Sequence, residues 1–290
     1  MTRAAAFLCA VLCAAAASAR AADPLEAKAR TWAERGYSLK ERVAHDVGGL
    51  PVAVAVYAST AGAGDRLEAY VVVSSAAYLG YTHPGRGDRL ELDITPAGRG
   101  FHDLLGDGSR IIAYHATIPA LNASSLELLR YKNFRFTRAA SFSEGRFAQD
   151  DGRVLIFSRD LPLGRFLSVG CSGFGTISQT AFRTRLYAAS RGKFVEVTGL
   201  HPRLFDEEIA RKEAALERLR GDLQKNAGEY LGLALSLYYD YAARGQARKG
   251  WERQGDFFRL PSSAPGSVRA CFAAMRGDLR RRLDIPADWP

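Results

Sequence analysis

Residues 49–68 read GLPVAVAVYASTAGAGDRLE, and residues 108–127, which lie 59 positions further along, read GSRIIAYHATIPALNASSLE. In each stretch a glycine stands three residues before an apolar run, and a Leu-Glu pair closes the stretch. The common offset indicates an internal repeat built from short strands, with chance similarity among valine-rich strands as the alternative explanation. A looser third copy begins at Gly152, and an insertion around residues 163–175 interrupts it.

The chain between residues 41 and 203 carries short apolar runs separated by glycine, which is typical of strands. The clearest candidates are residues 52–58, 67–74, 89–94, 110–117, 126–131, 153–158, 176–187 and 193–197. Units of this length cover one another's apolar faces, so we expect an antiparallel β-repeat domain, either partly propeller-like or a stacked-sheet array. A helical region follows it, and the expected fold class is α+β.

The turn before the second copy, residues 101–108, reads FHDLLGDG and precedes a hydrophobic strand. It resembles the FG-GAP type of β-propeller repeat, in which an Asp-x-Asp-x-Asp-Gly turn often holds calcium. Asp103 and Asp107 match the first and third acidic positions, whereas Leu105 supplies no oxygen. Because calcium takes about six to eight oxygen ligands, we expect a turn that has kept its shape and lost its ion. The resemblance covers residues 40–200 at most, and three copies are too few for an ordinary closed propeller.

From Leu204 onward the apolar residues recur at helical spacing. The first apolar stripe consists of Ile209, Leu216, Leu219 and Leu223. Residues 230–241 carry almost no polar face, so we expect that helix to be buried. Two more helices are expected, around residues 246–258 and 268–283. This succession of short helices predicts a small α-helical bundle or a helical-repeat-like cap of the tetratricopeptide kind.

The first 21 residues have the pattern of a secretory signal peptide, with a charged start, an apolar run and small residues before the cut. The apolar run is too short to span a membrane. Cleavage after Ala21 is preferred, because Asp23 and Pro24 then read as the N-cap and first residue of a helix. We therefore expect a periplasmic or secreted protein. The expected organisation is a signal peptide at 1–21, an N-terminal helix at 22–40, a β-repeat domain at 41–203 and an α-helical domain at 204–290.

The chain has 290 residues, 47% of them hydrophobic, and a formal net charge of +9. This length supports one large or two ordinary domains with cores of their own. Basic residues concentrate between Arg244 and Arg282. We interpret them as a solvated basic face, and peripheral contact with anionic lipid or glycan is the alternative. We expect no nucleic-acid partner and no membrane span.

Two cysteines, Cys171 and Cys271, follow the expected signal peptide, in a compartment where disulfides persist. They are a disulfide candidate. Two buried thiols are the alternative, because Cys271 lies on an apolar helix stripe and cysteine is a common core residue.

Residues 170–175, GCSGFG, form the one segment that looks catalytic. A hydrolase elbow requires Gly-x-Ser-x-Gly, and Phe174 occupies the last glycine position. His45, Asp93 and Ser172 have the chain order of a trypsin-like triad, but the residues around them do not match that family. The segment therefore favours a glycine-rich hairpin over a nucleophile.

Other reactive or ligating residues show no better pattern. A Cys171 nucleophile with His115 or His201 has no further support. The five histidines lack metal-ligand spacing, and Gly173-x-Gly175 lacks the strand-to-helix context of a dinucleotide loop. We therefore assign no catalytic residue, metal ligand or cofactor.

Two surface features have ordinary explanations. Asn122 begins a glycosylation sequon, which is informative only if the source glycosylates secreted proteins. Tyr78, Tyr81, Phe101 and Tyr114 are able to line a sugar-stacking surface, although core packing explains them better.

These observations favour an exported binding or scaffolding protein of the cell envelope with a protein or glycan partner, because repeated β-units and helical hairpins create broad contact surfaces. Two alternatives remain: a secreted hydrolase that uses Cys171 or Ser172, and a basic envelope protein that binds anionic lipid or glycan.

Overall fold

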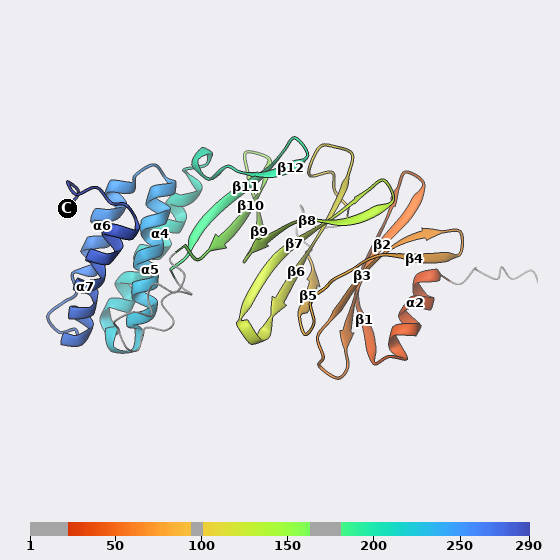
Figure 1. Ribbon diagram of the computed structural model, residues 1–290, viewed down its shortest axis with the longest axis horizontal. Coiled ribbons are helices and arrows are strands. Elements are labelled where there is room, and N and C mark those ends of the chain that lie inside the picture. The colour runs from red at the N-terminus through yellow and green to blue at the C-terminus, as the bar shows by residue number, and fades with distance from the viewer. Residues whose placement is uncertain (1–22, 94–100, 163–180) are drawn as a thin grey trace, which may run out of the picture. The chain divides into compact units, whose positions relative to one another are not determined.

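The computed structural model describes residues 23–93, 101–162 and 181–290 (Figure 1). The chain divides into two compact units, residues 1–141 and residues 142–290, called here the N-terminal unit and the C-terminal unit. The described residues form three separate four-stranded antiparallel sheets, without a closed barrel, and five α-helices. The expected α+β class is confirmed.

Each sheet is a meander of four consecutive strands in chain order. The first sheet contains β1 (Tyr37–Val47), β2 (Leu50–Ser59), β3 (Arg66–Val73) and β4 (Ala76–Thr82). The second sheet contains β5 (Arg89–Leu92), β6 (Arg110–Ile118), β7 (Ala123–Lys132) and β8 (Arg135–Ser143). The third sheet contains β9 (Arg146–Asp150), β10 (Arg153–Asp160), β11 (Arg183–Ser190) and β12 (Lys193–Glu196).

Two-residue turns with positive φ join several of these strands. Gly48 (φ 65°) and Gly49 (φ 82°) connect β1 to β2, and Asp151 (φ 47°) and Gly152 (φ 75°) connect β9 to β10. A turn with positive φ at both positions matches the right-handed twist of paired strands, and glycine adopts it without steric cost. The glycines that separate the apolar runs therefore set the positions of the hairpins.

The 59-residue offset is visible in the first two sheets. Glu68 lies on β3 and Glu127 lies on β7, and both side chains are buried. β4 begins at Ala76 and β8 begins at Arg135, again 59 positions apart. The two sheets are therefore equivalent strand by strand from β2 and β6 onward.

Four strands, β1, β4, β8 and β9, are absent from the predicted set. Their side chains are mostly exposed or half-buried, so they lack the apolar run by which the other strands are recognised. The predicted strand at 176–187 corresponds to β11 from Arg183 onward, and its portion up to residue 180 lies outside the described residues.

The core of the N-terminal unit lies between the first and second sheets. Val52, Val54 and Val56 of β2 pack in one cluster with Ile112 and Tyr114 of β6. The alternation of these buried residues along each strand places them on one face of their sheet.

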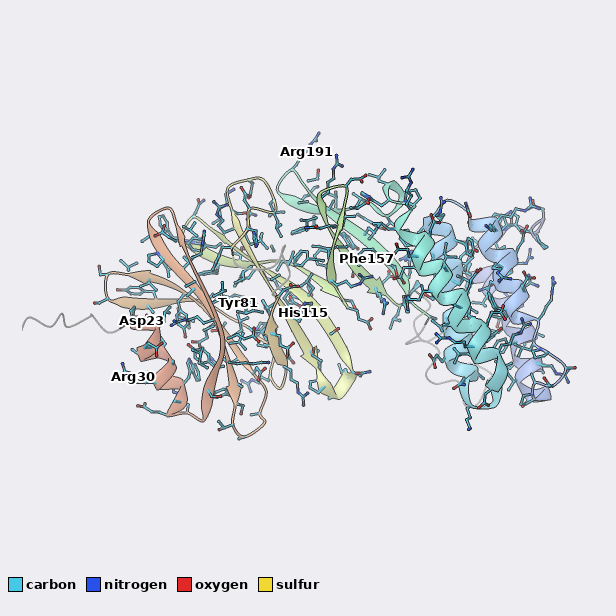
Figure 2. The ribbon with its side chains drawn as sticks, turned by 180° about the vertical axis from the view of Figure 1, so that it is seen from behind. Asp23, Arg30, Tyr81, His115, Phe157 and Arg191 are labelled. Atoms are coloured by element: carbon cyan, nitrogen blue, oxygen red, sulfur yellow. The ribbon has the colours of Figure 1, made fainter. Side chains whose placement is uncertain are left out.

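The opposite face of the first sheet packs against helix α2 (Pro24–Ala33). Leu25 and Trp32 of α2 form a cluster with Ala53, Ala55 and Tyr57 of β2. The Asp23 side chain, at the start of α2 (Figure 2), accepts a hydrogen bond of 2.9 Å from the backbone N–H of Leu25. The helix therefore begins where the capping pattern predicts.

The C-terminal unit combines the third sheet with helices α4 (Leu204–Leu219), α5 (Leu223–Ala243), α6 (Ala247–Phe258) and α7 (Gly266–Arg282). Phe157 of β10 and Leu186 of β11 belong to the same apolar cluster as buried residues of all four helices. The compact units therefore separate after residue 141, whereas the predicted β-repeat and helical domains divide at 203. Among the helices of the described residues, none has the length and apolarity needed to cross a bilayer.

Candidate functional site

The segment that looked catalytic in the sequence, residues 170–175, lies outside the described residues. The proposed disulfide between Cys171 and Cys271 therefore stays a prediction. Cys271 itself lies on α7, where it is half-buried and packs against the helical core.

The histidines considered for catalysis lie in different parts of the fold. The His45 ring stacks on Phe101 with 6.2 Å between ring centroids. His115 Nε2 lies 3.0 Å from Asp93 Oδ2, and His201 Nδ1 lies 2.6 Å from Asp150 Oδ2. Asp93 thus pairs with His115 on the second sheet. Within residues 23–93, 101–162 and 181–290, no group of three or more His, Cys, Asp or Glu side chains is placed to hold a metal ion.

The acidic turn before β6 is held together by its own side chains. Asp103 accepts hydrogen bonds from the backbone N–H groups of Asp107 (3.2 Å) and Gly108 (3.1 Å). The Asp107 carboxylate contacts Arg130 and lies 2.9 Å from Lys132 Nζ. Hydrogen bonds from Ser109 and from Lys132 hold the pKa of Asp107 well below its ordinary value. Side-chain cations therefore balance the charge of this carboxylate.

The four aromatic residues considered for sugar stacking do not share a surface. Tyr114 and Phe101 are buried, whereas Tyr78 is 60% exposed. The Tyr114 hydroxyl instead joins a polar chain, lying 3.2 Å from the Tyr81 hydroxyl and 3.0 Å from His83 Nδ1. Burial raises the pKa of Tyr114 well above its ordinary value, so the hydroxyl stays protonated. These rings serve packing.

His83 links these hydroxyl groups to a carboxylate. Its Nε2 lies 2.8 Å from Asp88 Oδ2, and both side chains are largely buried. A Cβ at Gly85 would stand 1.9 Å from the same carboxylate oxygen, so only glycine fits there. The chain of Tyr81, Tyr114, His83 and Asp88 belongs to the N-terminal unit, and it satisfies polar groups that would otherwise be buried without partners.

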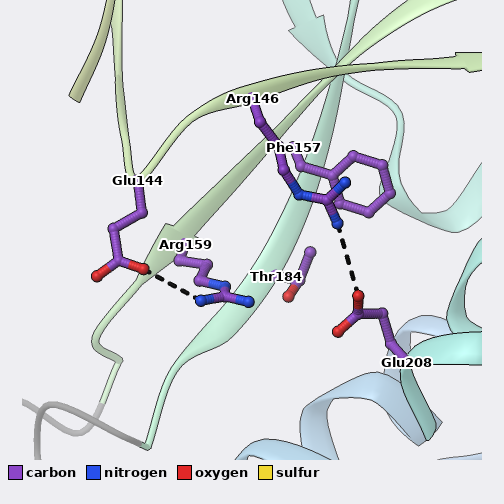
Figure 3. Close-up of a pocket in the computed structure, with 6 residues that line it drawn as sticks. All are labelled: Glu144, Arg146, Phe157, Arg159, Thr184 and Glu208. Carbon is purple, nitrogen blue, oxygen red and sulfur yellow. Dashed lines mark hydrogen bonds and ion pairs between the residues drawn. The ribbon is translucent and has the colours of Figure 1, made fainter. Parts of the chain in front are cut away.

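The candidate site that sequence reasoning missed is a small pocket in the C-terminal unit, called here the arginine pocket (Figure 3). Its volume is about 110 Å³. The lining residues are Glu144 from the turn after β8, Arg146 from β9, Phe157 and Arg159 from β10, Thr184 from β11 and Glu208 from α4. Five segments that are distant in sequence therefore meet at one cavity.

Two arginines of the pocket are held in place from two sides. Arg146 lies 4.4 Å from the ring centroid of Phe157 and 3.5 Å from Glu208. Arg159 lies 4.1 Å from the ring centroid of Phe182 and 3.2 Å from Glu144. A guanidinium that rests on an aromatic ring is oriented and partly desolvated, which strengthens its interaction with an anion. Figure 3 shows both ion pairs on either side of Thr184.

Thr184 lines the cavity with a side chain that carries one hydroxyl group. The residue as a whole is only 4% exposed. Its hydroxyl can both donate and accept a hydrogen bond, so it is able to contact a ligand in the cavity.

The pocket wall is continuous with a buried charge cluster on α4 and α5. Lys212, one turn beyond Glu208, is fully buried, contacts Asp240 and donates a hydrogen bond of 2.6 Å to Ser236. Its Nζ lies 4.3 Å from the ring centroid of Phe182, the ring that also carries Arg159. Burial lowers the pKa of Lys212 and raises that of Asp240, and their mutual contact opposes both shifts.

One sequence signal for this cluster is present. Lys212 stands between Ile209 and Leu216 at helical spacing, so it lies on the apolar stripe of α4. A lysine on a buried stripe requires a partner, and Asp240 lies on the helix with almost no polar face. The pocket itself left no such signal, because its charged residues look like ordinary surface residues.

Comparisons with protein-family models, with curated proteins and with solved structures find no match for this chain.

Proposed function

We propose that this chain is an exported binding protein whose arginine pocket holds a small ligand through a carboxylate group. The observation that carries the proposal is the pair of ring-stacked guanidinium groups, Arg146 and Arg159, on either side of the Thr184 side chain. Charge-assisted hydrogen bonds from arginine to a carboxylate are among the strongest polar contacts that proteins make.

Binding is favoured over catalysis because of the chemistry at the pocket. Its lining includes arginine, glutamate, phenylalanine and threonine side chains, and both arginines are held by ion pairs. Arginine remains protonated at neutral pH, so it positions a carboxylate and does not act as a base. Ser236 and Lys212 are adjacent but fully buried, and Asp240 engages Lys212.

The test is titration of the full mature chain with alanine and with acetate, followed by calorimetry or ligand-observed NMR. We expect at least one of them to bind, and the double variant Arg146→Gln/Arg159→Gln to weaken that binding by at least about 10-fold, since each charge-assisted bond contributes about 1.5–3 kcal/mol. Arg153→Gln, an exposed arginine on β10, is the matched control. Binding of neither probe, or equal binding by the double variant, would overturn the proposal.

Export, the repeat architecture and the envelope partner belong to the same proposal. We expect three stacked β-repeats, of a degenerate propeller type, to end in a small helical bundle that presents the basic residues between Arg244 and Arg282. The signal pattern of residues 1–21 supports a periplasmic or secreted location. Expression of the whole chain in a bacterial host with a periplasm, followed by N-terminal mass determination, tests this. Mature protein that begins at Ala22 supports export, and an intact N-terminus contradicts it.

A further inference from the structure

The charged side chains that line the arginine pocket balance one another. Arg146 faces Glu208 at 3.5 Å, and Arg159 faces Glu144 at 3.2 Å. Two positive and two negative groups therefore line a cavity of about 110 Å³. A simple carboxylate that reaches either arginine must also approach two glutamates, which costs Coulomb energy in a partly buried site.

The two glutamates differ in exposure and in surroundings. The Glu208 side chain is 15% exposed and also contacts Arg211. Burial raises the pKa of Glu208, but Arg211, Lys212 and Arg159 together lower it by more, so this carboxylate stays ionised. The Glu144 side chain is 46% exposed and belongs to a turn residue with φ 45°. Glu144 can therefore leave Arg159 for water, whereas Glu208 remains a fixed negative charge.

We infer that the arginine pocket selects a small α-amino acid in its zwitterionic form, with the ligand ammonium on Glu208 and the ligand carboxylate on Arg159 in place of Glu144. This inference rests on the proposed function and names its ligand class. A zwitterion adds no net charge to the pocket. Its ammonium therefore offsets the repulsion that a simple anion meets from the two glutamates. The Thr184 hydroxyl, which can donate and accept, is then able to contact either end of the ligand.

The size of the pocket restricts the side chain of the ligand. Pockets for drug-sized ligands are usually about 300–1,000 Å³, so this cavity fits only the smallest amino acids. We therefore expect glycine, alanine and serine to bind, and larger amino acids to bind more weakly.

The experiment compares three ligands that differ by one charge. Alanine carries both groups, propionate lacks the ammonium without any added bulk, and alaninamide lacks the carboxylate. We expect calorimetry on the mature protein to show both analogues at least about 10-fold weaker than alanine, because each loses one charge-assisted contact.

Two variants assign the contacts. Glu208→Gln is expected to remove most of the preference for alanine over propionate. Thr184→Val is expected to weaken the binding of alanine about 5-fold or more through loss of the hydroxyl. Glu207→Gln, the exposed neighbour on α4, is the matched control. Thermal unfolding of each variant checks that it is folded.

The outcomes separate this inference from the proposed function. Equal binding of alanine and propionate, with loss of both in Arg146→Gln/Arg159→Gln, overturns the zwitterion inference and keeps the carboxylate pocket. Unchanged preference in Glu208→Gln also overturns it. Binding of none of the three ligands, nor of acetate, overturns both.

Discussion

The first and second sheets present faces at equivalent repeat positions, yet different elements cover them. Helix α2 covers the face of the first sheet that contains Ala53 and Ala55. The first sheet itself covers the face of the second sheet that contains Ile112 and Tyr114, which lie 59 positions later. One face thus packs against a helix, and its counterpart packs against a neighbouring sheet.

The side chains at these positions explain the difference. Alanines at the centre of β2 leave room for the large Trp32 side chain of α2, whereas the larger residues at the same positions of β6 fill the space between two sheets. Helix α2 covers this face of the first sheet.

The buried glutamates also differ between the first and second sheets. Glu68 accepts hydrogen bonds from Trp32 Nε1 of α2 (3.0 Å) and from Arg66 Nε (2.8 Å). Glu127, 59 positions later, accepts from the hydroxyls of Ser125 (2.7 Å) and Ser141 (2.6 Å). The carboxylate is repeated, but its donors differ. The covering helix supplies one donor to Glu68, whereas both hydroxyl donors to Glu127 lie on strands of its own sheet.

The third sheet extends the comparison, because helices also cover it but bury a charged pair. We expect Lys212→Ala to lower the free energy of unfolding by about 3–5 kcal/mol, since Asp240 would remain as an uncompensated buried charge. Urea unfolding measures this. The double variant Lys212→Met/Asp240→Leu should recover most of the loss, and a double variant no more stable than Lys212→Ala would contradict this explanation.

The helix cover of the first sheet is tested at Trp32. Trp32→Ala should reduce the free energy of unfolding of the N-terminal unit by about 3 kcal/mol, through lost burial and one donor fewer for Glu68. Lys28→Ala, an exchange on the same helix without loss of a buried ring, is the control. A loss below about 1 kcal/mol in Trp32→Ala would show that α2 is not an essential cover.

Removing one polar contact on each face is expected to have a smaller effect on stability. Tyr114→Phe removes the hydroxyl that joins Tyr81 and His83, and we expect a loss of about 1–2 kcal/mol. Tyr57→Phe, on the helix-covered face, removes only a 3.5 Å contact with Tyr70 and should cost less. Chemical denaturation of both variants measures which of them loses more stability. A larger loss in Tyr57→Phe would count against the proposed role of the polar chain.

The smallest effect is expected at the turns that precede β2 and β6. Asp107 stands 59 positions after Gly48, so the second copy has a carboxylate where the first has none. Because the folded-state pKa of Asp107 is lowered, its charge stabilises the fold above the unfolded-state value of about pH 4, and this contribution is lost as pH falls toward the folded-state value. Melting temperatures of wild type and Asp107→Asn should therefore differ at neutral pH and converge below about pH 4. A constant difference across that range would rule out the charge as the cause.

Much of the strand arrangement was predictable. The runs that became β2, β3, β6, β7 and β10 contain consecutive buried residues, so their apolar character is continuous in the sequence. The exposed strands β1 and β4 were not predictable in the same way, because their extended conformation depends on hydrogen bonding to the neighbouring strand.

The candidate site was not predictable. Glu144, Arg146, Arg159 and Glu208 each look like exposed polar residues in their own segments, and no local spacing links them. Residues around Cys171 attracted more attention only because glycine, serine and cysteine lie next to one another there. A site built across several strands and a helix has no short motif.

Local sequence is enough to place the glycine turns, the buried strands, the 59-residue offset and the helical residues 204–282, because backbone preference and apolar spacing are local properties. Contacts between distant segments are what place α2 on the first sheet, join the third sheet to the core of the helices, and bring two arginines together around Thr184. These outcomes depend on which faces pack together, and no single stretch of the chain specifies the packing between distant segments.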